Sequence, residues 1–279
     1  MAPSSEASVV VQPAPAVRQP AVLASMPLRL PTAVSFIAHM APLPAVLLSY
    51  ELLRGLFRQR GAIHVGDLYE LEARLFSVST PSGPRALSEV IAQGSVPWLD
   101  ALCGVTYFLF LIEVIAASAY LFFRRSRRKA LELTLGFFIA NLAGWVIWFV
   151  YPAAPPWYVD QYGMGPALVD VASSPAGLAR VDAWLHLPLA TTFYSKSANV
   201  FGAVPSLHMT YATLVAWVLG PFGGWLRPAA IAFAFSMAFS AVYLRHHYIL
   251  DVLAGAALGL LVGVGLRRVP GFTTLGGPA

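Results

Sequence analysis

The sequence predicts an all-α polytopic integral membrane protein with six transmembrane helices. Hydrophobic residues make up 58% of the chain, charged residues make up only 11%, and the mean hydropathy is +0.68. Soluble domains carry roughly 25% charged residues, so most of this chain must contact lipid. A bilayer-spanning helix needs about 20 mostly apolar residues. Such runs lie near 32–54, 98–123, 130–150, 204–222, 227–245 and 249–267.

The composition divides the chain into four parts. The first is a flexible tail rich in Ala, Pro, Ser and Val, without the basic start and continuous apolar core of a signal peptide. The second holds the first span, an interfacial helix and a loop. The third is a membrane core with the remaining spans, and the fourth is a short tail. Their bounds are 1–30, 31–97, 98–268 and 269–279.

The second part contains three kinds of segment. Pro42 and Pro44 lie inside the first apolar run, and we expect them to kink or divide its helix. From His64 to Phe76, apolar residues at helical spacing mix with charged residues, which predicts an amphipathic helix at the membrane interface. The segment 79–97 is rich in proline and glycine and is predicted to be a loop.

A block of basic residues indicates how the chain is oriented. It lies between the second and third apolar runs and carries much of the formal net charge of +5. A block beside two spans marks the cytoplasmic face and attracts anionic lipids; it does not favour nucleic acid as a partner. Alternation of the spans then places both termini in the cytoplasm. The block consists of Arg124, Arg125, Arg127, Arg128 and Lys129.

Three polar clusters flank apolar runs at the opposite, non-cytoplasmic face. They are Tyr151–Tyr158, Gly202–His208 and Arg245–Asp251. Ionisable groups beside membrane spans are costly unless they serve a pathway or a site. The long connection 151–203 joins two of the clusters, and long connections of this kind usually form a lid or part of a site. We therefore expect the functional site where the three clusters meet.

The spacing within these clusters indicates nucleophilic and acid–base chemistry. His247 and Asp251 are four residues apart, so on a helix they share one face and can hydrogen-bond. A carboxylate on one imidazole nitrogen fixes the tautomer and leaves the other nitrogen free to attack. His208, from another span, is then a candidate general acid. Ser206 stands at a predicted helix start, where free backbone N–H groups can receive a phosphate oxygen.

Other residues inside the apolar runs have a structural interpretation. Glu113 and Asn141 are expected to form hydrogen bonds between helices. Glycines recur every four residues in the last run and predict close helix packing; they are Gly255, Gly259 and Gly263.

The ordered motifs resemble a known family. Pro205-Ser206-Leu207-His208, together with the His247 and Asp251 pair, resembles the second and third motifs of the type 2 phosphatidic acid phosphatase superfamily. Longer segments resemble the branch that contains inositol phosphorylceramide synthase, the aureobasidin target. These segments are Tyr151–Tyr158, Gly202–His208 and His246-His247-Tyr248 with Asp251. This resemblance implies a six-helix fold with a non-cytoplasmic site. It also implies that His247 forms a phosphohistidine, that Asp251 orients it and that His208 protonates the leaving group, with no metal or other cofactor.

The sequence departs from the superfamily pattern at its cationic positions. The Lys and Arg of the first motif align with Gly144 and Tyr151, and the Ser-Arg that begins the third motif aligns with Ser240 and Ala241. Synthases of the inositol phosphorylceramide type depart similarly, which favours that branch. Some other cation must then offset the phosphate charge. The candidates on the same face are Arg245, Lys196 and His246.

The aromatic residues of the first polar cluster have two possible roles. Tyr151, Trp157 and Tyr158 can shape the entrance for a lipid substrate, or they can belong to the aromatic belt at the membrane surface.

The favoured function is a membrane lipid phosphotransferase. Its partners are a donor phospholipid, whose phosphorylated head group (such as inositol phosphate) is moved, and a lipid alcohol acceptor. One alternative is a lipid phosphate or diphosphate phosphatase that uses the same histidines, with water as the acceptor. A distant alternative is a non-enzymatic transporter or metal-binding protein. Lysine occurs only at Lys129 and Lys196, and this bias toward arginine is typical of a GC-rich bacterial genome. The expected location is therefore a bacterial plasma membrane. The oligomeric state stays open.

Overall fold

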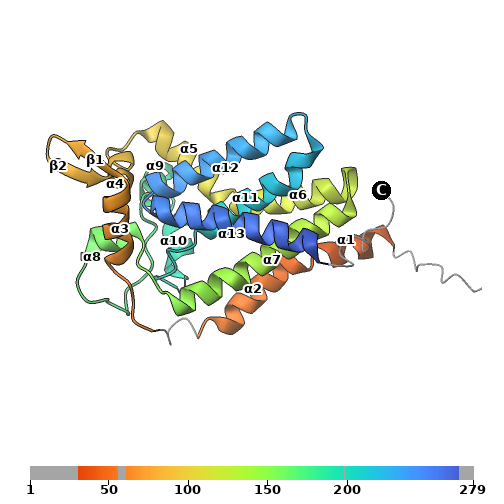
Figure 1. Ribbon diagram of the computed structural model, residues 1–279, viewed down its shortest axis with the longest axis horizontal. Coiled ribbons are helices and arrows are strands. Elements are labelled where there is room, and N and C mark those ends of the chain that lie inside the picture. The colour runs from red at the N-terminus through yellow and green to blue at the C-terminus, as the bar shows by residue number, and fades with distance from the viewer. Residues whose placement is uncertain (1–30, 56–60, 198, 270–279) are drawn as a thin grey trace, which may run out of the picture.

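The computed structural model describes residues 31–55, 61–197 and 199–269. The predicted tails 1–30 and 269–279 therefore lie outside the described residues, apart from Val269. Long helices lie side by side along the long axis of the molecule, and short elements gather at one end (Figure 1). We call that end the motif end, because it holds the three polar clusters.

The bundle is built from apolar helices that follow the predicted runs. Each of the six runs contains at least one helix, because apolar residues dominate it and the prolines stand mostly in first turns, where a missing N–H costs nothing. The helices are α1 (Thr32–Met40), α2 (Pro42–Leu53), α5 (Pro97–Phe108), α6 (Phe110–Arg124), α7 (Arg127–Val150), α11 (Leu207–Leu219), α12 (Leu226–Tyr243) and α13 (Ile249–Arg268).

The chain is a polytopic membrane protein. Within the described residues, four helical stretches are long and apolar enough to cross a membrane: Thr32–Leu53, α7, α12 and α13. Helices α5 and α6 pass the same test as a pair, but they are bent by 52° at Leu109. Helix α11 with the following turn forms a shorter apolar helix, Leu207–Phe222. The expected division of the first run is confirmed, since α1 ends and α2 begins on either side of Ala41.

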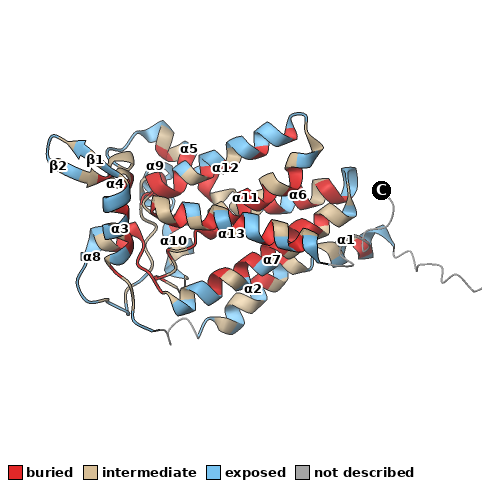
Figure 2. Ribbon diagram, in the orientation of Figure 1, coloured by how far each residue is buried: buried red, intermediate tan, exposed pale blue. Residues whose placement is uncertain are grey.

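Helix α11 lies at the centre and is almost entirely buried (Figure 2). It packs against α13 more closely than side chains would normally allow. A Cβ atom built on Gly255 would lie 2.2 Å from the carbonyl oxygen of Ser206, and one on Gly259 would lie 2.8 Å from that of Thr210. The Thr210 hydroxyl donates across this contact to the carbonyl of Gly255 at 3.0 Å. The close packing predicted from the glycine spacing is thus confirmed.

The hydrogen bond between helices that was predicted for Asn141 joins α7 to α11. The Tyr211 hydroxyl donates to Oδ1 of Asn141 at 2.7 Å. Glu113 does not follow the same expectation, because its Oε2 is buried without a hydrogen-bond partner among the described residues.

The motif end consists of short elements. Before the core come α3 (Asp67–Leu75), the strands β1 (Ser77–Thr80) and β2 (Gly83–Ala86), and α4 (Leu87–Ile91). Between α7 and α11 lie α8 (Pro156–Tyr162), α9 (Leu178–Leu185) and α10 (Leu189–Ser195).

The predicted loop over 79–97 is wrong in part. The strands β1 and β2 pair antiparallel, with Ser77 opposite Ala86 and Thr80 opposite Gly83. The tight turn between them is possible because Gly83 adopts a φ of +109°, which glycine reaches without steric cost. The Thr80 hydroxyl closes the turn by donating to the carbonyl of Gly83 at 2.6 Å. Prolines and glycine that indicated a loop therefore shape a hairpin.

The amphipathic helix predicted over 64–76 forms as α3, but its faces differ from the expected ones. Leu71 and Leu75 are exposed, whereas Leu68 and Glu72 are buried in the protein. The exposed apolar face suits a helix at a membrane interface. The buried carboxyl of Glu72 was not expected from the pattern.

Candidate active site

The three predicted clusters meet at the motif end through their main chains. Isolated parallel bridges join His64 to Ala153 and Ala153 to Gly202. Segments far apart in the sequence thus lie side by side, and Ala203, the residue after the last bridge, donates its amide to the carbonyl of Ala153. The carbonyl of Ala203 in turn contacts the side chain of His247. The segment around His64, which precedes the first cluster in the sequence, therefore belongs to the same framework as the histidines.

The turn after α12 presents His247. The carbonyl of Ala241 accepts hydrogen bonds from the amides of His246 and His247, both at 3.1 Å. Arg245 makes this compact turn possible by adopting a φ of +61°, a conformation that non-glycine residues rarely adopt. Backbone strain of this kind persists where the surrounding structure holds it, and it is frequent at active sites.

Two oxygen atoms fix the tautomer of His247. Its Nδ1 lies 2.9 Å from the carbonyl oxygen of Ala203 and 3.4 Å from Oδ2 of Asp251. A carbonyl and a carboxylate can only accept hydrogen bonds, so Nδ1 carries the proton. In the neutral ring, Nε2 then holds the free lone pair. The pairing of His247 with Asp251 is the one predicted for a nucleophile, but its helical basis was wrong, because His247 precedes the first residue of α13 by two positions.

Asp251 is fully buried in the first turn of α13, and it links that helix to α11. Its Oδ2 accepts a hydrogen bond from the amide of Tyr248 at 2.9 Å. Its main-chain carbonyl accepts another from the amide of Ser206 at 3.0 Å. Helix α11 begins after Ser206, as predicted, and the Oγ of Ser206 accepts from the amide of Met209; the phosphate contact at this helix start stays a prediction. The starts of the two helices are thus bonded to each other.

His208 lies in the first turn of α11, beside His247. The two ring centroids are 6.0 Å apart. The ring of Tyr107 stacks on His208 at a centroid distance of 4.0 Å, and Phe110 packs edge-on at 4.6 Å. The structure therefore brings the predicted general acid next to the predicted nucleophile and fixes its ring between aromatic side chains.

His246 is held by a different set of contacts. Its ring stacks between Tyr107 and Tyr194, each at a centroid distance of 4.8 Å, and Nε2 donates to the carbonyl of Pro175 at 3.1 Å. Burial and, to a lesser degree, the neighbouring His247 lower the pKa of His246 to about 3. The ring is therefore neutral at physiological pH and supplies no cationic contact. The predicted phosphate contact of His246 stays a prediction for the neutral ring.

The two predicted cations have contacts of their own. The guanidinium of Arg245 pairs with Asp160, with N–O distances of 2.8 and 2.5 Å, while its Nη1 is buried without a hydrogen-bond partner among the described residues. Lys196 is exposed at the C-terminal end of α10, and its carbonyl accepts a hydrogen bond from Arg54 at 2.9 Å. Their phosphate contacts stay predictions.

The predicted aromatic residues occupy three different places. Trp157 is buried and lines an apolar cavity beside the histidines. The Tyr158 hydroxyl accepts a hydrogen bond from the amide of Leu168 at 2.7 Å, which fixes the connection after α8. Tyr151 ends α7 and stacks on His64 at 4.0 Å. His64 also bonds to Asp67 at 2.6 Å.

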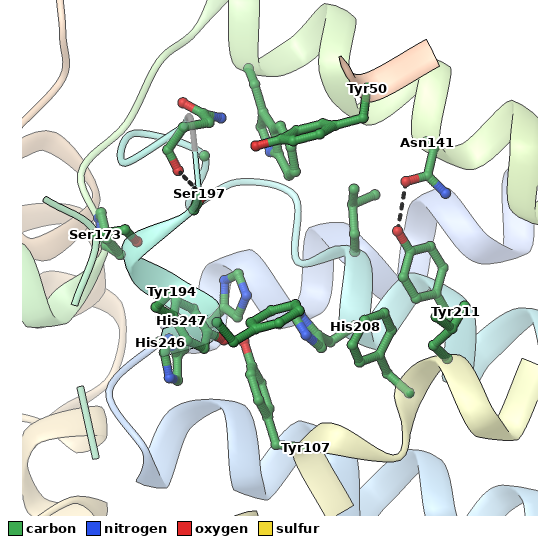
Figure 3. A pocket seen from close by; sticks show the side chains of 18 of the residues that line it. Tyr50, Tyr107, Asn141, Ser173, Tyr194, Ser197, His208, Tyr211, His246 and His247 are labelled. Atoms are coloured by element: carbon green, nitrogen blue, oxygen red, sulfur yellow. Dashed lines mark hydrogen bonds between the residues drawn. The ribbon is translucent and has the colours of Figure 1, made fainter. Parts of the chain in front are cut away.

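A largely apolar cavity of about 510 Å³ opens beside the histidines. Figure 3 shows His208, His246 and His247 gathered around Tyr107 and Tyr194, with the bonded pair Asn141 and Tyr211 in the same cavity. Among the described residues that line it, none is a lysine or an arginine. Its apolar wall comes from several helices and includes Val46, Leu47, Phe110, Leu111, Phe137, Trp145 and Phe193.

Sequence reasoning missed Tyr107 and Tyr194, which hold the rings of His208 and His246. Tyr107 lies in an apolar run, where an aromatic side chain is normally interpreted as part of the core. Tyr194 lies in the connection 151–203, away from the recognised motifs. No local signal marks either residue, because stacking between distant helices leaves no periodic pattern.

Helical membrane architecture and paired histidines beside an apolar cavity define a candidate membrane enzyme for a lipid-sized substrate. The sequence model of the PAP2 superfamily matches residues 83–264. The chain therefore belongs to the PAP2 superfamily, and it is an enzyme of that superfamily of phosphatases and phosphotransferases.

Individual relatives agree with this placement. The chain is 35% identical to the phosphoinositol dihydroceramide synthase of Bacteroides thetaiotaomicron over 217 residues, which are 75% of this chain and 70% of that protein. It is 36% identical to the inositol phosphorylceramide synthase catalytic subunit of Saccharomyces cerevisiae and 35% identical to the inositol phosphorylceramide synthase of Candida albicans. Each match covers 63% of this chain but only 44% and 38% of the two fungal proteins. No solved structure matches the chain significantly.

Proposed function

We propose that this chain is a membrane lipid phosphotransferase that moves a phosphorylated head group from a donor phospholipid to a lipid alcohol. The observation that carries the proposal is the His208 and His247 pair beside an apolar cavity that no described lysine or arginine lines. A phosphodiester carries a single negative charge, whereas a phosphomonoester carries up to two near neutral pH. A cavity without these cations suits the diester, and diester chemistry favours transfer over hydrolysis of a monoester.

The first half-reaction forms a covalent intermediate on His247. Its Nε2 attacks the phosphorus of the donor, and the bond from phosphorus to the oxygen of the lipid alcohol breaks. Protonated His208 gives its proton to that leaving oxygen. Asp251 stabilises the ring while it carries positive charge, because Nδ1–H already points between two oxygen acceptors.

The second half-reaction returns the enzyme to its starting state. The acceptor hydroxyl attacks phosphorus, the bond from phosphorus to Nε2 of His247 breaks, and His208 takes the hydroxyl proton. The backbone amides of Leu207 and His208 at the start of α11 are the groups assigned to the phosphate oxygens. Arg245, whose Nη1 has no hydrogen-bond partner among the described residues, is a candidate cation outside the cavity lining. Trp157 lines the cavity, while Tyr151 and Tyr158 support the framework around it. Lys196 adjoins Ser197, which lines the cavity, and is a further candidate cation.

The names of the relatives suggest the substrates. We infer that phosphatidylinositol is the donor, that inositol phosphate is the transferred group, and that a ceramide-like lipid alcohol is the acceptor. The bacterial and fungal synthases support this choice through their similarity to the chain, at 35% and 36% identity.

The membrane arrangement follows from the basic block. We infer six spans, with the bent pair of α5 and α6 as the second and the short α11 as the fourth. The block 124–129 lies in the cytoplasm together with both termini, and the motif end lies on the non-cytoplasmic face of a bacterial plasma membrane.

A product analysis of the purified protein in liposomes tests the proposal. Labelled phosphatidylinositol and a labelled lipid monophosphate are supplied separately, each with and without ceramide, diacylglycerol or a polyprenol. We expect a new labelled phospholipid only from phosphatidylinositol and only when an acceptor is present. Release of free phosphate from the monophosphate, unchanged by the acceptor, would instead establish the phosphatase alternative.

Two controls separate the enzyme from the transporter alternative. The His247→Ala variant should form no product. Transfer should survive EDTA and be inhibited by vanadate, which mimics a phosphoryl transition state. Within the described residues, no group of three His, Cys, Asp or Glu side chains is arranged to hold a metal ion.

A further inference from the structure

Glu72 is a buried carboxyl that comes from outside the matched family region. It lies in the middle of α3 and is completely inaccessible to solvent, whereas the superfamily match begins at residue 83. Its Oε2 accepts a hydrogen bond from the amide of Ile249 at 2.6 Å. The two residues are 177 positions apart in the sequence. A hydrogen bond this short, between residues this far apart in the sequence, indicates a specific connection between α3 and α13.

The amide that Glu72 binds belongs to the first residue of α13. The first amides of a helix have no partner within the helix, and buried ones need an acceptor from elsewhere. Asp251 supplies one acceptor, since its Oδ2 bonds to the amide of Tyr248 at 2.9 Å. Glu72 supplies the next, on the adjoining amide of Ile249. Two buried carboxyl groups from different parts of the chain thus share the start of one helix.

The position of this start decides the position of the reacting groups. His247 stands two residues before Ile249, and Asp251 stands two residues after it. The contact of His247 Nδ1 with Asp251 Oδ2 is 3.4 Å, longer than an ordinary hydrogen bond, so a small shift in the first turn would break it. Misplacement of a reacting group by about 1 Å can cost roughly 100-fold in rate.

From these contacts we propose that Glu72 is a positioning residue of the transfer site. Its carboxyl holds the first turn of α13 through the amide of Ile249, and it thereby fixes His247 and Asp251 relative to each other. The interfacial helix α3 is then part of the catalytic framework, as is the main-chain bridge from His64 to Ala153. This role rests on the proposed function of His247 as nucleophile.

The environment of Glu72 indicates which property of the side chain matters. Burial raises the pKa of its carboxyl, the nearby Asp251 raises it further, and Ser88 and the amide of Ile249 oppose these effects. A second negative charge so close to Asp251 brings no advantage, while an acceptor oxygen at this position does. An amide side chain of the same length should therefore replace the carboxyl.

The test compares three variants of the full chain in liposomes: Glu72→Gln, Glu72→Leu and the matched control Glu70→Leu. Glu70 lies on the same helix with its side chain 60% exposed. We expect Glu72→Gln to keep kcat within about 3-fold of the wild type. We expect Glu72→Leu to lose roughly 10- to 100-fold in kcat with KM for the donor unchanged. The control should match the wild type in both constants.

Amide hydrogen exchange on the same proteins separates positioning from general loss of structure and from failure of the proposed function. In Glu72→Leu, the amides of residues 248–252 should exchange faster while those of α7 and α11 stay as protected as in the wild type. The exchange measurement needs no substrate, so it tests the positioning role even if the wild type transfers nothing. Equal kcat for Glu72→Leu and wild type would overturn the proposal, as would equal losses in the Gln and Leu variants. Unchanged exchange at residues 248–252 would overturn it too.

Discussion

At the residue scale, the chemistry depends on which nitrogen of His247 carries a proton. Both neighbours of Nδ1 are acceptors, the carbonyl of Ala203 and the carboxylate of Asp251, and this leaves Nε2 as the atom that we propose to attack. The same carboxylate caps α13 through Tyr248, so one side chain both orients the nucleophile and holds the turn that carries it.

The Asp251→Asn variant tests the role of this carboxylate beside His247. The Asp251→Asn side chain has the same size, but it lacks the charge that stabilises the ring when His247 carries the transferred group. The carbonyl of Ala203 still accepts from Nδ1, so the variant isolates the effect of that charge. We expect kcat to fall roughly 1000- to 10,000-fold with little change in KM, as occurs when a carboxylate beside a catalytic histidine becomes an amide. Steady-state kinetics of the purified variant measures the loss; retention of a tenth of the activity would contradict the proposed role.

His246 predicts a pH dependence of stability. Its pKa is lowered to about 3 in the folded protein, against an ordinary value near 6.5. Between these values the unfolded chain binds one more proton than the folded chain, so stability falls as the pH drops from about 6.5 toward 3. The His246→Gln variant, which keeps an N–H near Pro175, should lose less Tm between pH 7.5 and 4.5. Thermal unfolding in detergent measures this difference.

The control for His246 is His186→Gln, because His186 is exposed. It should show the same pH dependence of Tm as the wild type. If His246→Gln also follows the wild-type curve, the buried neutral histidine is not the group that makes the motif end sensitive to acid.

The principal residues could be predicted from sequence, and their surroundings could not. His247 and Asp251 share a helical spacing, and alternation of the spans brings His208 to the same face. Tyr107 and Tyr194, which stack on these rings, come from segments whose patterns indicate core or loop. Arg245 was expected to bind phosphate because of its position alone, and its partner Asp160 became visible only in the folded chain.

At the element scale, the contact of α13 with α11 positions both helix starts. A Cβ atom on Gly255 would lie only 2.2 Å from the carbonyl oxygen of Ser206, which is closer than two such atoms can approach. A Gly255→Ala side chain must therefore push the helices apart at the level of Ser206 and Asp251. Overpacking of this kind typically costs about 1–3 kcal/mol. We expect a clear fall in Tm and a loss of transfer activity; both are measurable in detergent.

The matched control lies on the same helix. A Cβ on Gly265 would meet no atom within 4 Å, so Gly265→Ala should keep the wild-type Tm and activity. Equal behaviour of the Gly255 and Gly265 variants would show that the two helices are not held at this contact.

The elements themselves were predictable to different degrees. Apolar runs located the long helices, because length and hydropathy are local properties of the chain. The faces of α3 were not predictable, since an amphipathic pattern assigns Glu72 to water, whereas the start of α13 needs a buried acceptor there. The hairpin of β1 and β2 was missed because Pro81 and Gly83 indicate a turn without revealing that the flanking residues pair.

At the scale of the whole molecule, we propose that the basic block and the motif end lie on opposite sides of the membrane. The single cysteine, Cys103, is buried, so a Cys103→Ala background allows one reporter cysteine at a time. In intact cells, a membrane-impermeant maleimide should label Lys196→Cys. It should label Trp225→Cys, in the exposed turn before α12, only after permeabilisation. The reverse pattern would place the active site in the cytoplasm.

The central claim is that His247 carries the transferred group, and a trapping experiment tests it most directly. The protein is mixed with phosphatidylinositol labelled in the inositol ring, without acceptor, and quenched in base, where a phosphohistidine survives. Peptide mass spectrometry should find inositol phosphate on His247, the label should be lost in acid, and ceramide added before the quench should remove it. Absence of the adduct from a protein that transfers the group at full rate, or an adduct on another residue, would contradict the mechanism.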